Sequence, residues 1–160
     1  MNKPLVIYWD SCAFIHCLQN SPVHAPSLKE HVEQARRGQC RIATAAVSLA
    51  EVCKLPEAGV LPEEQTEKIL AFLKNDYILL YQIDRDIGES AHQIIRAHGL
   101  KPMDALHVAA ALAAKADFFI TTDTHKYRRD SLVGHSGKIG IPPLKIELPN
   151  TKMFHPLFNT

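Results

Sequence analysis

Residues 5–10 of the 160-residue chain read Leu-Val-Ile-Tyr-Trp-Asp, and this stretch decides which fold the rest can build. Its first five residues, Leu5–Trp9, form a continuous apolar run that is rich in β-branched and aromatic side chains. Such a run is typical of a strand that is buried on both faces, as strands are in a parallel sheet covered by helices. Asp10 then places a carboxylate directly after the predicted strand.

Apolar runs and helical segments alternate along the rest of the chain. Further strands are predicted at residues 41–47, 77–83, 117–121 and 144–148. Helices are predicted at residues 11–19, 28–37 and 48–55, after Pro62, after a capping Asp84, and from Pro102 to about Lys115. This alternation favours a parallel sheet with helices on its faces. We therefore expect an α/β fold, a three-layer α/β/α sandwich with a central parallel sheet over residues 1–149, followed by a tail at 150–160.

Composition narrows the class of protein. The chain is 46% hydrophobic and 22% charged, as expected of one globular domain rather than a disordered chain. Its four cysteines form no CxxC pair, which indicates free thiols in a reducing compartment. Neither a signal peptide nor a membrane span is predicted. We expect a soluble, cytoplasmic protein that does not bind membranes.

Four carboxylates follow predicted strands or open the helix that leads into one. Asp10 follows the first strand, Glu51 comes soon after the second, and Asp123 comes near the end of the fourth. Asp104 lies in the first turn of the alanine-rich helix. Because ligands of open α/β sheets bind beyond the carboxyl ends of the strands, we expect these four carboxylates to gather at one edge.

Each carboxylate also has a purely structural interpretation. Ser48 and Glu51 match a capping box, and Asp104 suits the positive end of its helix dipole. Asp10 is a candidate N-cap, and Asp123 is a candidate turn residue. Four unrelated caps have no reason to converge on one edge, so the clustered interpretation is favoured when the four are taken together.

A cluster of carboxylates repels itself unless a cation lies among them. Oxygen ligands alone favour hard ions such as Mg²⁺ or Mn²⁺. The chemistry that uses such ions is displacement at phosphorus. The sequence therefore points to an enzyme that acts on a phosphate ester.

Four motifs of this chain resemble, in order, the acidic motifs of PIN domains. They are Val-Ile-Tyr-Trp-Asp-Ser at 6–11, Ser-Leu-Ala-Glu-Val at 48–52, Pro-Met-Asp-Ala-Leu-His-Val-Ala-Ala-Ala at 102–111 and Phe-Ile-Thr-Thr-Asp at 119–123. Within that family the chain is most similar to single-domain ribonucleases of the VapC type, the toxins of bacterial toxin–antitoxin pairs. The resemblance runs from Leu5 to about Leu148.

The resemblance implies a metal-dependent endoribonuclease. It implies that Asp10, Glu51, Asp104 and Asp123 are the catalytic, metal-binding residues around Mg²⁺ or Mn²⁺. Ser11 and Thr121 match positions that support such a site. It also implies a homodimer and a cognate antitoxin partner. Cys12, the long basic stretch at 125–141 and the tail depart from the family pattern and leave substrate and partner open.

The net charge of +1 conceals a basic segment at residues 125–145. Its side chains Lys126, Arg128 and Arg129 begin just after Asp123 and are expected to bind the phosphates of RNA. The alternative is a solvated loop.

Other interpretations stay open at this stage. The chain could be a PIN-fold module that binds RNA or protein without cutting, or a nuclease or phosphatase with another substrate such as DNA. Asp84 and Asp86 could join the site, although capping is favoured for them. His107, one turn after Asp104, could reach the site but is more typical of a packed histidine.

Overall fold

The sheet is parallel throughout and has five strands. The computed structural model describes residues 3–55, 59–123 and 131–155 of the chain. The strands lie in the order β5-β2-β1-β6-β7, with each neighbouring pair parallel. Their bounds are β1 Leu5–Trp9, β2 Cys40–Ala45, β5 Ile78–Tyr81, β6 Phe118–Ile120 and β7 Lys145–Glu147. β1 is thus the central strand, as a buried apolar run requires.

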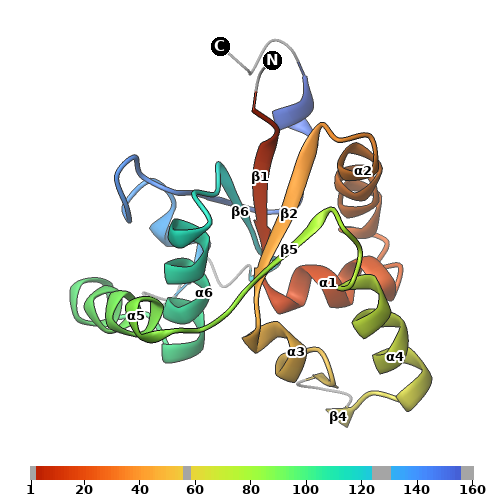
Figure 1. The fold of residues 1–160 in the computed structure, drawn as a ribbon, viewed down its shortest axis with the longest axis horizontal. Helices are drawn as coiled ribbons and strands as arrows, with labels where there is room; N and C mark the ends of the chain where they lie inside the picture. Colours follow the sequence, from red (N-terminus) through yellow and green to blue (C-terminus); the bar gives the residue numbers. More distant parts are fainter. Residues whose placement is uncertain (1–2, 56–58, 124–130, 156–160) are drawn as a thin grey trace.

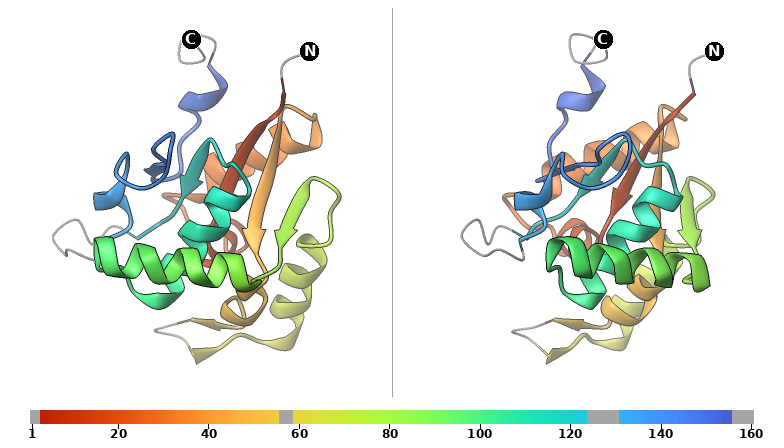
Figure 2. Two further views of the ribbon diagram at one scale, coloured as in Figure 1. Left: turned by 60° about the vertical axis from the view of Figure 1, so that its left-hand side comes forward. Right: turned by 90° about the vertical axis from the view of Figure 1, so that its left-hand side faces the viewer.

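Helices cover both faces of this sheet, which confirms the predicted three-layer α/β/α architecture (Figure 1 and Figure 2). One face carries α1 (Ser11–Leu18), α2 (Ala25–Arg36) and α4 (Glu63–Phe72), and the other carries α5 (Arg85–His98) and α6 (Pro102–Ala113). The short helix α3 (Val47–Glu51) follows β2 at the end of the sheet to which the strands point. No helix in the described part of the chain is long and apolar enough to cross a bilayer.

The side chains of β1 alternate between the two cores. Val6 and Tyr8 belong to the core beneath α5 and α6, whereas Ile7 and Trp9 belong to the core beneath α1, α2 and α4. All four are buried. Because successive strand residues point to opposite faces, one short run anchors both outer layers at once.

The order of the strands changes direction at β1. The chain first passes from β1 to β2 and β5 on one side, and then crosses to β6 and β7 on the other side. A crevice forms at the carboxyl ends of the strands where the order reverses, and ligands of open α/β sheets bind there. The residues that follow β1 and β6 flank that position.

The structure differs from the sequence-based prediction in its smallest elements. The helix predicted at 48–55 ends at Glu51, and a two-stranded antiparallel hairpin follows, made of β3 (Lys54–Leu55) and β4 (Gly59–Val60). Single turns of 3₁₀ helix lie at η1 (Val133–His135) and η2 (Lys152–Phe154). In η2, Met153 is buried against the core that contains Trp9.

Candidate metal centre

Asp10 lies at the carboxyl end of the central strand and is buried. The backbone N–H of Ala13 donates a hydrogen bond of 3.0 Å to Asp10 Oδ1, so Asp10 is the N-cap of α1, as one of the two interpretations predicted. Burial, aided by the charge of Glu51, raises the pKa of the Asp10 carboxyl. His107, the hydroxyl of Thr121 and the capping bond from Ala13 act in the opposite direction.

Asp104 lies in the first turn of α6, where the sequence placed it. Because α6 leads into β6 and packs along β2, its first turn comes to the same edge of the sheet as Asp10. Burial, followed by the negative charges of Asp10 and Asp123, raises the pKa of Asp104 to about 6. The structure therefore brings Asp10 and Asp123 within electrostatic range of Asp104.

Glu51 reaches the same region by a different route from the predicted one. It is the last residue of α3 rather than a first-turn residue, and the capping-box interpretation is wrong. The reason is that Ser48 lies inside the helix, where its hydroxyl is 2.8 Å from the hydroxyl of Thr44. The Glu51 carboxylate instead accepts from the hydroxyl of Ser11 and lies 2.6 Å from Nε2 of His107.

These contacts set the charge of Glu51. Burial raises the pKa of its carboxyl, but the hydrogen bond and charge of His107 and the hydroxyl of Ser11 outweigh that effect, and the net pKa is lowered. The same carboxylates also affect the nearby Cys12 thiol. Desolvation, followed by the charges of Asp10, Glu51 and Asp104, raises its pKa to about 12.

Thr121 and Asp123 follow β6 at the same edge of the sheet. Thr121 is fully buried, and its Oγ1 accepts a hydrogen bond of 3.1 Å from the backbone N–H of Asp123. Thr121 also contacts the Asp10 carboxyl and lowers its pKa. The predicted RNA-binding residues Lys126, Arg128 and Arg129 lie outside the residues that the structure describes.

His107 is part of the cluster, although its sequence context favoured a packed core residue. It is buried, and its two ring nitrogens contact Tyr8 on one side and Glu51 on the other. The signal in the sequence was its position one turn after Asp104 on the same helix. That spacing places both side chains on one helix face.

The donor set of this edge suits a hard divalent cation, because it consists of carboxylate and hydroxyl oxygens. Burial raises the pKa of both Asp10 and Asp104, and the charge of Glu51 adds to the rise at Asp10 as the charges of Asp10 and Asp123 do at Asp104. This concentration of negative charge is one that such an ion would neutralise. In the described residues, no three His, Cys, Asp or Glu side chains already converge on a single point.

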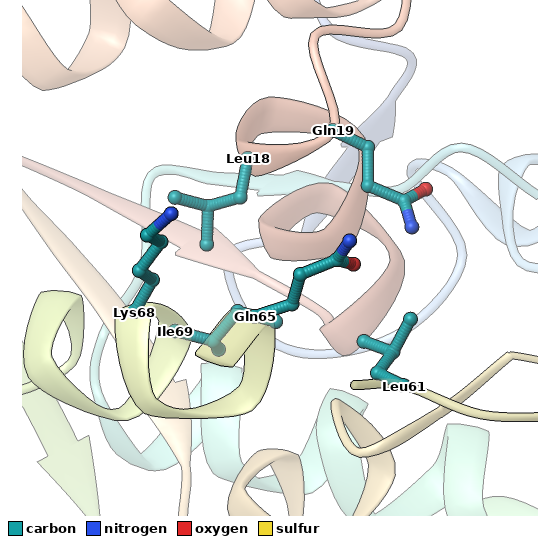
Figure 3. Close-up of a pocket in the computed structure, with 6 residues that line it drawn as sticks. All are labelled: Leu18, Gln19, Leu61, Gln65, Lys68 and Ile69. Atoms are coloured by element: carbon teal, nitrogen blue, oxygen red, sulfur yellow. The ribbon is translucent and has the colours of Figure 1, made fainter. Parts of the chain in front are cut away.

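A separate groove lies away from these carboxylates, between α1 and α4 (Figure 3). It has a volume of about 370 Å³ and is lined by Leu18, Gln19, Leu61, Gln65, Lys68 and Ile69. None of the candidate site residues lines it, so it plays no part in the arrangement described above.

Comparison with solved structures finds the same fold in proteins of low sequence identity. One is from the VapBC2 complex of Rickettsia felis bound to a DNA fragment of its promoter, with 18% identity and a TM-score of 0.60, covering 91% of this chain and 100% of that one. Another is from a toxin–antitoxin complex of Klebsiella pneumoniae, with 19% identity and a TM-score of 0.54, covering 76% and 89%. A third is VapC20 of Mycobacterium tuberculosis, described as a toxin that cleaves the sarcin–ricin loop, with 14% identity and a TM-score of 0.57, covering 71% and 86%.

Comparison with curated protein sequences finds no match. The family model of the PIN domain matches residues 7–132, which is most of the chain and includes all four carboxylates. The chain belongs to the PIN domain family.

Proposed function

We propose that this protein is a metal-dependent endoribonuclease. The observation that carries the proposal is the electrostatic coupling of Asp10, Asp104 and Asp123 at the carboxyl edge of the sheet, where burial and like charge raise the pKa of Asp104 to about 6. Burying like charges within reach of one another without a cation costs free energy. Membership of the PIN domain family supports the same assignment.

We assign Asp10, Glu51, Asp104 and Asp123 as the residues that hold Mg²⁺ or Mn²⁺. The bound ion would supply a water nucleophile that is deprotonated near neutral pH, and charge stabilisation for the phosphorane-like transition state. Asp10 is fixed for this task by its capping bond to α1, and Glu51 by Ser11. Thr121 holds the backbone of Asp123 beside Asp10.

RNA is the proposed substrate, and an antitoxin the proposed protein partner. Solved structures with the same fold include a toxin described as cleaving the sarcin–ricin loop and two toxin–antitoxin complexes. On this basis we propose that the chain is a toxin, whereas a cytoplasmic location and a homodimer stay predictions from the family resemblance. Binding of the RNA backbone by Lys126, Arg128 and Arg129 stays a prediction from charge alone.

The decisive test compares Asp10→Asn and Asp104→Asn with the wild type in an RNA cleavage assay with Mn²⁺. Both variants should lose cleavage by 10²-fold or more, on the order of what removal of one charge-stabilising group costs. Asn preserves the N-cap at position 10, so α1 should stay folded. The matched control is Asp76→Asn, because Asp76 precedes β5 at the opposite edge of the sheet and is exposed.

Three outcomes separate this proposal from its alternatives. Full cleavage by either variant, or in excess EDTA, contradicts a metal-dependent mechanism. Absence of cleavage by the wild type, together with no rise in its melting temperature on Mn²⁺ titration, favours a binding module that does not cut. Preferential cleavage of a matched DNA over RNA would reassign the substrate.

A further inference from the structure

His107 is held rigidly between the central strand and Glu51. Its ring is 2% exposed and lies edge-on to Tyr8, with the ring centroids 5.8 Å apart. Tyr8 is itself stacked on Phe119 of β6, at 5.0 Å between centroids. Tyr8, itself packed on Phe119, thus holds one side of the imidazole in place.

The contacts of the ring fix which nitrogen carries the proton. The Tyr8 hydroxyl lies 2.8 Å from Nδ1, and because a phenol buried in the core keeps its proton, it donates to that nitrogen. Nδ1 is then the acceptor, and in the neutral ring the N–H must be at Nε2. Nε2 lies 2.6 Å from Glu51 Oε2 and donates to it.

Both groups that hold Glu51 engage the same carboxylate oxygen. Ser11 Oγ and His107 Nε2 each bond to Oε2, and they lie 3.3 Å apart. Among the hydrogen bonds of the described residues none ends on Oε1 of Glu51, which leaves that oxygen for a cation.

This arrangement excludes a serine hydrolase triad. In a triad the carboxylate and the serine contact opposite ring nitrogens of the histidine. Here Glu51 and Ser11 both lie on the Nε2 side, and Tyr8 takes Nδ1. The histidine therefore orients a carboxylate and does not activate the Ser11 hydroxyl.

We propose that His107 is a positioning residue that holds Glu51 in its ion-binding orientation through the relay Tyr8–His107–Glu51. The inference rests on the proposed function, because the relay matters for metal binding only if Glu51 is one of the residues that hold the ion. Groups that hold a metal-ligating side chain from behind commonly change metal affinity 10–100-fold when they are removed.

The test measures Mn²⁺ affinity directly, by the paramagnetic resonance signal of free Mn²⁺ in a titration of the folded protein. His107→Leu keeps the apolar packing but removes the donor, and should weaken Mn²⁺ binding about 10–100-fold. His107→Gln restores an N–H at the end of the side chain and should recover most of the affinity. His31→Leu is the matched control, because His31 is also fully buried but packs in the other core.

A double-mutant cycle shows whether His107 acts through Glu51. In a Glu51→Gln background, His107→Leu should cause little further loss of Mn²⁺ affinity, because the side chain that it positions is already altered. An equal further loss would overturn the relay. Wild-type affinity in His107→Leu, with only a lower melting temperature, would reduce His107 to a packing residue. If the wild-type protein binds no Mn²⁺ at millimolar concentration, the proposed function fails as well as the relay.

Discussion

A single side chain, Asp10, serves both the fold and the candidate site. Its Oδ1 caps α1, and its charge raises the pKa of Asp104 across the edge of the sheet. The two roles are compatible because a cap engages only one of the two carboxylate oxygens. A residue of this kind cannot be assigned from its local pattern, since the pattern of a cap and that of a ligand coincide at this position.

Asp104 should lower the stability of the metal-free protein at neutral pH. An acid whose folded pKa, about 6, exceeds its ordinary value of 3.8 binds more protons in the native state, so stability falls as pH rises between these values. Above pH 6 the full penalty applies. Asp104→Asn should therefore stabilise the metal-free protein at pH 7.5 by about 1–2 kcal/mol, after allowing for solvent screening of a half-buried group.

Urea denaturation at pH 7.5 and at pH 3.5, with EDTA present, measures this effect. The gain from Asp104→Asn should largely vanish at pH 3.5, where the aspartic acid is protonated in the native state and mostly protonated in the unfolded state. Added Mn²⁺ should reverse the order, because the ion stabilises the wild type more than the variant. A variant that is less stable than the wild type at pH 7.5 in EDTA would contradict the repulsion between Asp104 and its neighbours.

The sequence was sufficient to locate the carboxylates that follow strands, but not the contacts of Glu51. Asp10 and Asp123 follow apolar runs, and Asp104 opens a long helix, so the topology alone brings them to one edge. The position of the Glu51 side chain depends on where the five-residue helix α3 ends. A helix this short has no hydrophobic periodicity from which its end could be predicted. The role of His107 could not be predicted, because its orientation depends on a contact with Tyr8, which is distant in the sequence.

At the scale of secondary-structure elements, predictability follows length and burial. Strands that are apolar throughout and helices with a clear apolar stripe were confirmed, because hydrophobic periodicity dominates their formation. The hairpin of β3 and β4 has two residues in each strand, which is too few to show an alternation of apolar and polar residues. For the same reason η1 and η2, which are single turns, could not be predicted from the sequence.

Asp84 should matter to α5 and not to the candidate site. Its Oδ1 accepts a hydrogen bond of 2.9 Å from the backbone N–H of Ile87, which confirms the predicted N-cap. Asp84→Ala should destabilise the protein by about 1 kcal/mol, whereas Asp84→Asn, which keeps an accepting oxygen, should cost much less. Thermal denaturation checks the pair. Loss of RNA cleavage by folded Asp84→Asn would instead place this carboxylate in the site.

At the scale of the whole molecule, the C-terminal residues are tied to the central strand through one histidine. Trp9 Nε1 donates a hydrogen bond of 3.2 Å to Nδ1 of His31, and His31 Nε2 donates one of 2.6 Å to the backbone oxygen of Asn150. Phe154 lies edge-on to the same ring, at 5.5 Å. The neutral imidazole satisfies both partners and so links α2, β1 and the segment 150–155.

Protonation of His31 should open this connection. Burial lowers the pKa of His31 below its ordinary value of 6.5, although the bond to Asn150 and the charge of Glu30 partly oppose the shift. The unfolded chain then binds the proton more readily than the native state, so stability is complete above pH 6.5 and is lost as pH falls through that value. A second proton at Nδ1 would also remove the acceptor that Trp9 needs.

The two pH effects have opposite signs and overlap, so the wild-type profile alone cannot separate them. Acidification from pH 6.5 relieves the repulsion at Asp104 while it destabilises the neutral His31. His31→Gln should therefore lose less stability toward pH 4 in EDTA than the wild type, whereas Asp104→Asn should show a steeper acid loss than the wild type. Urea denaturation across this range gives the slopes, which do not depend on the packing cost of either substitution. Parallel profiles for wild type and His31→Gln would mean that His31 binds its proton equally in both states, and that the connection to Asn150 is insensitive to pH.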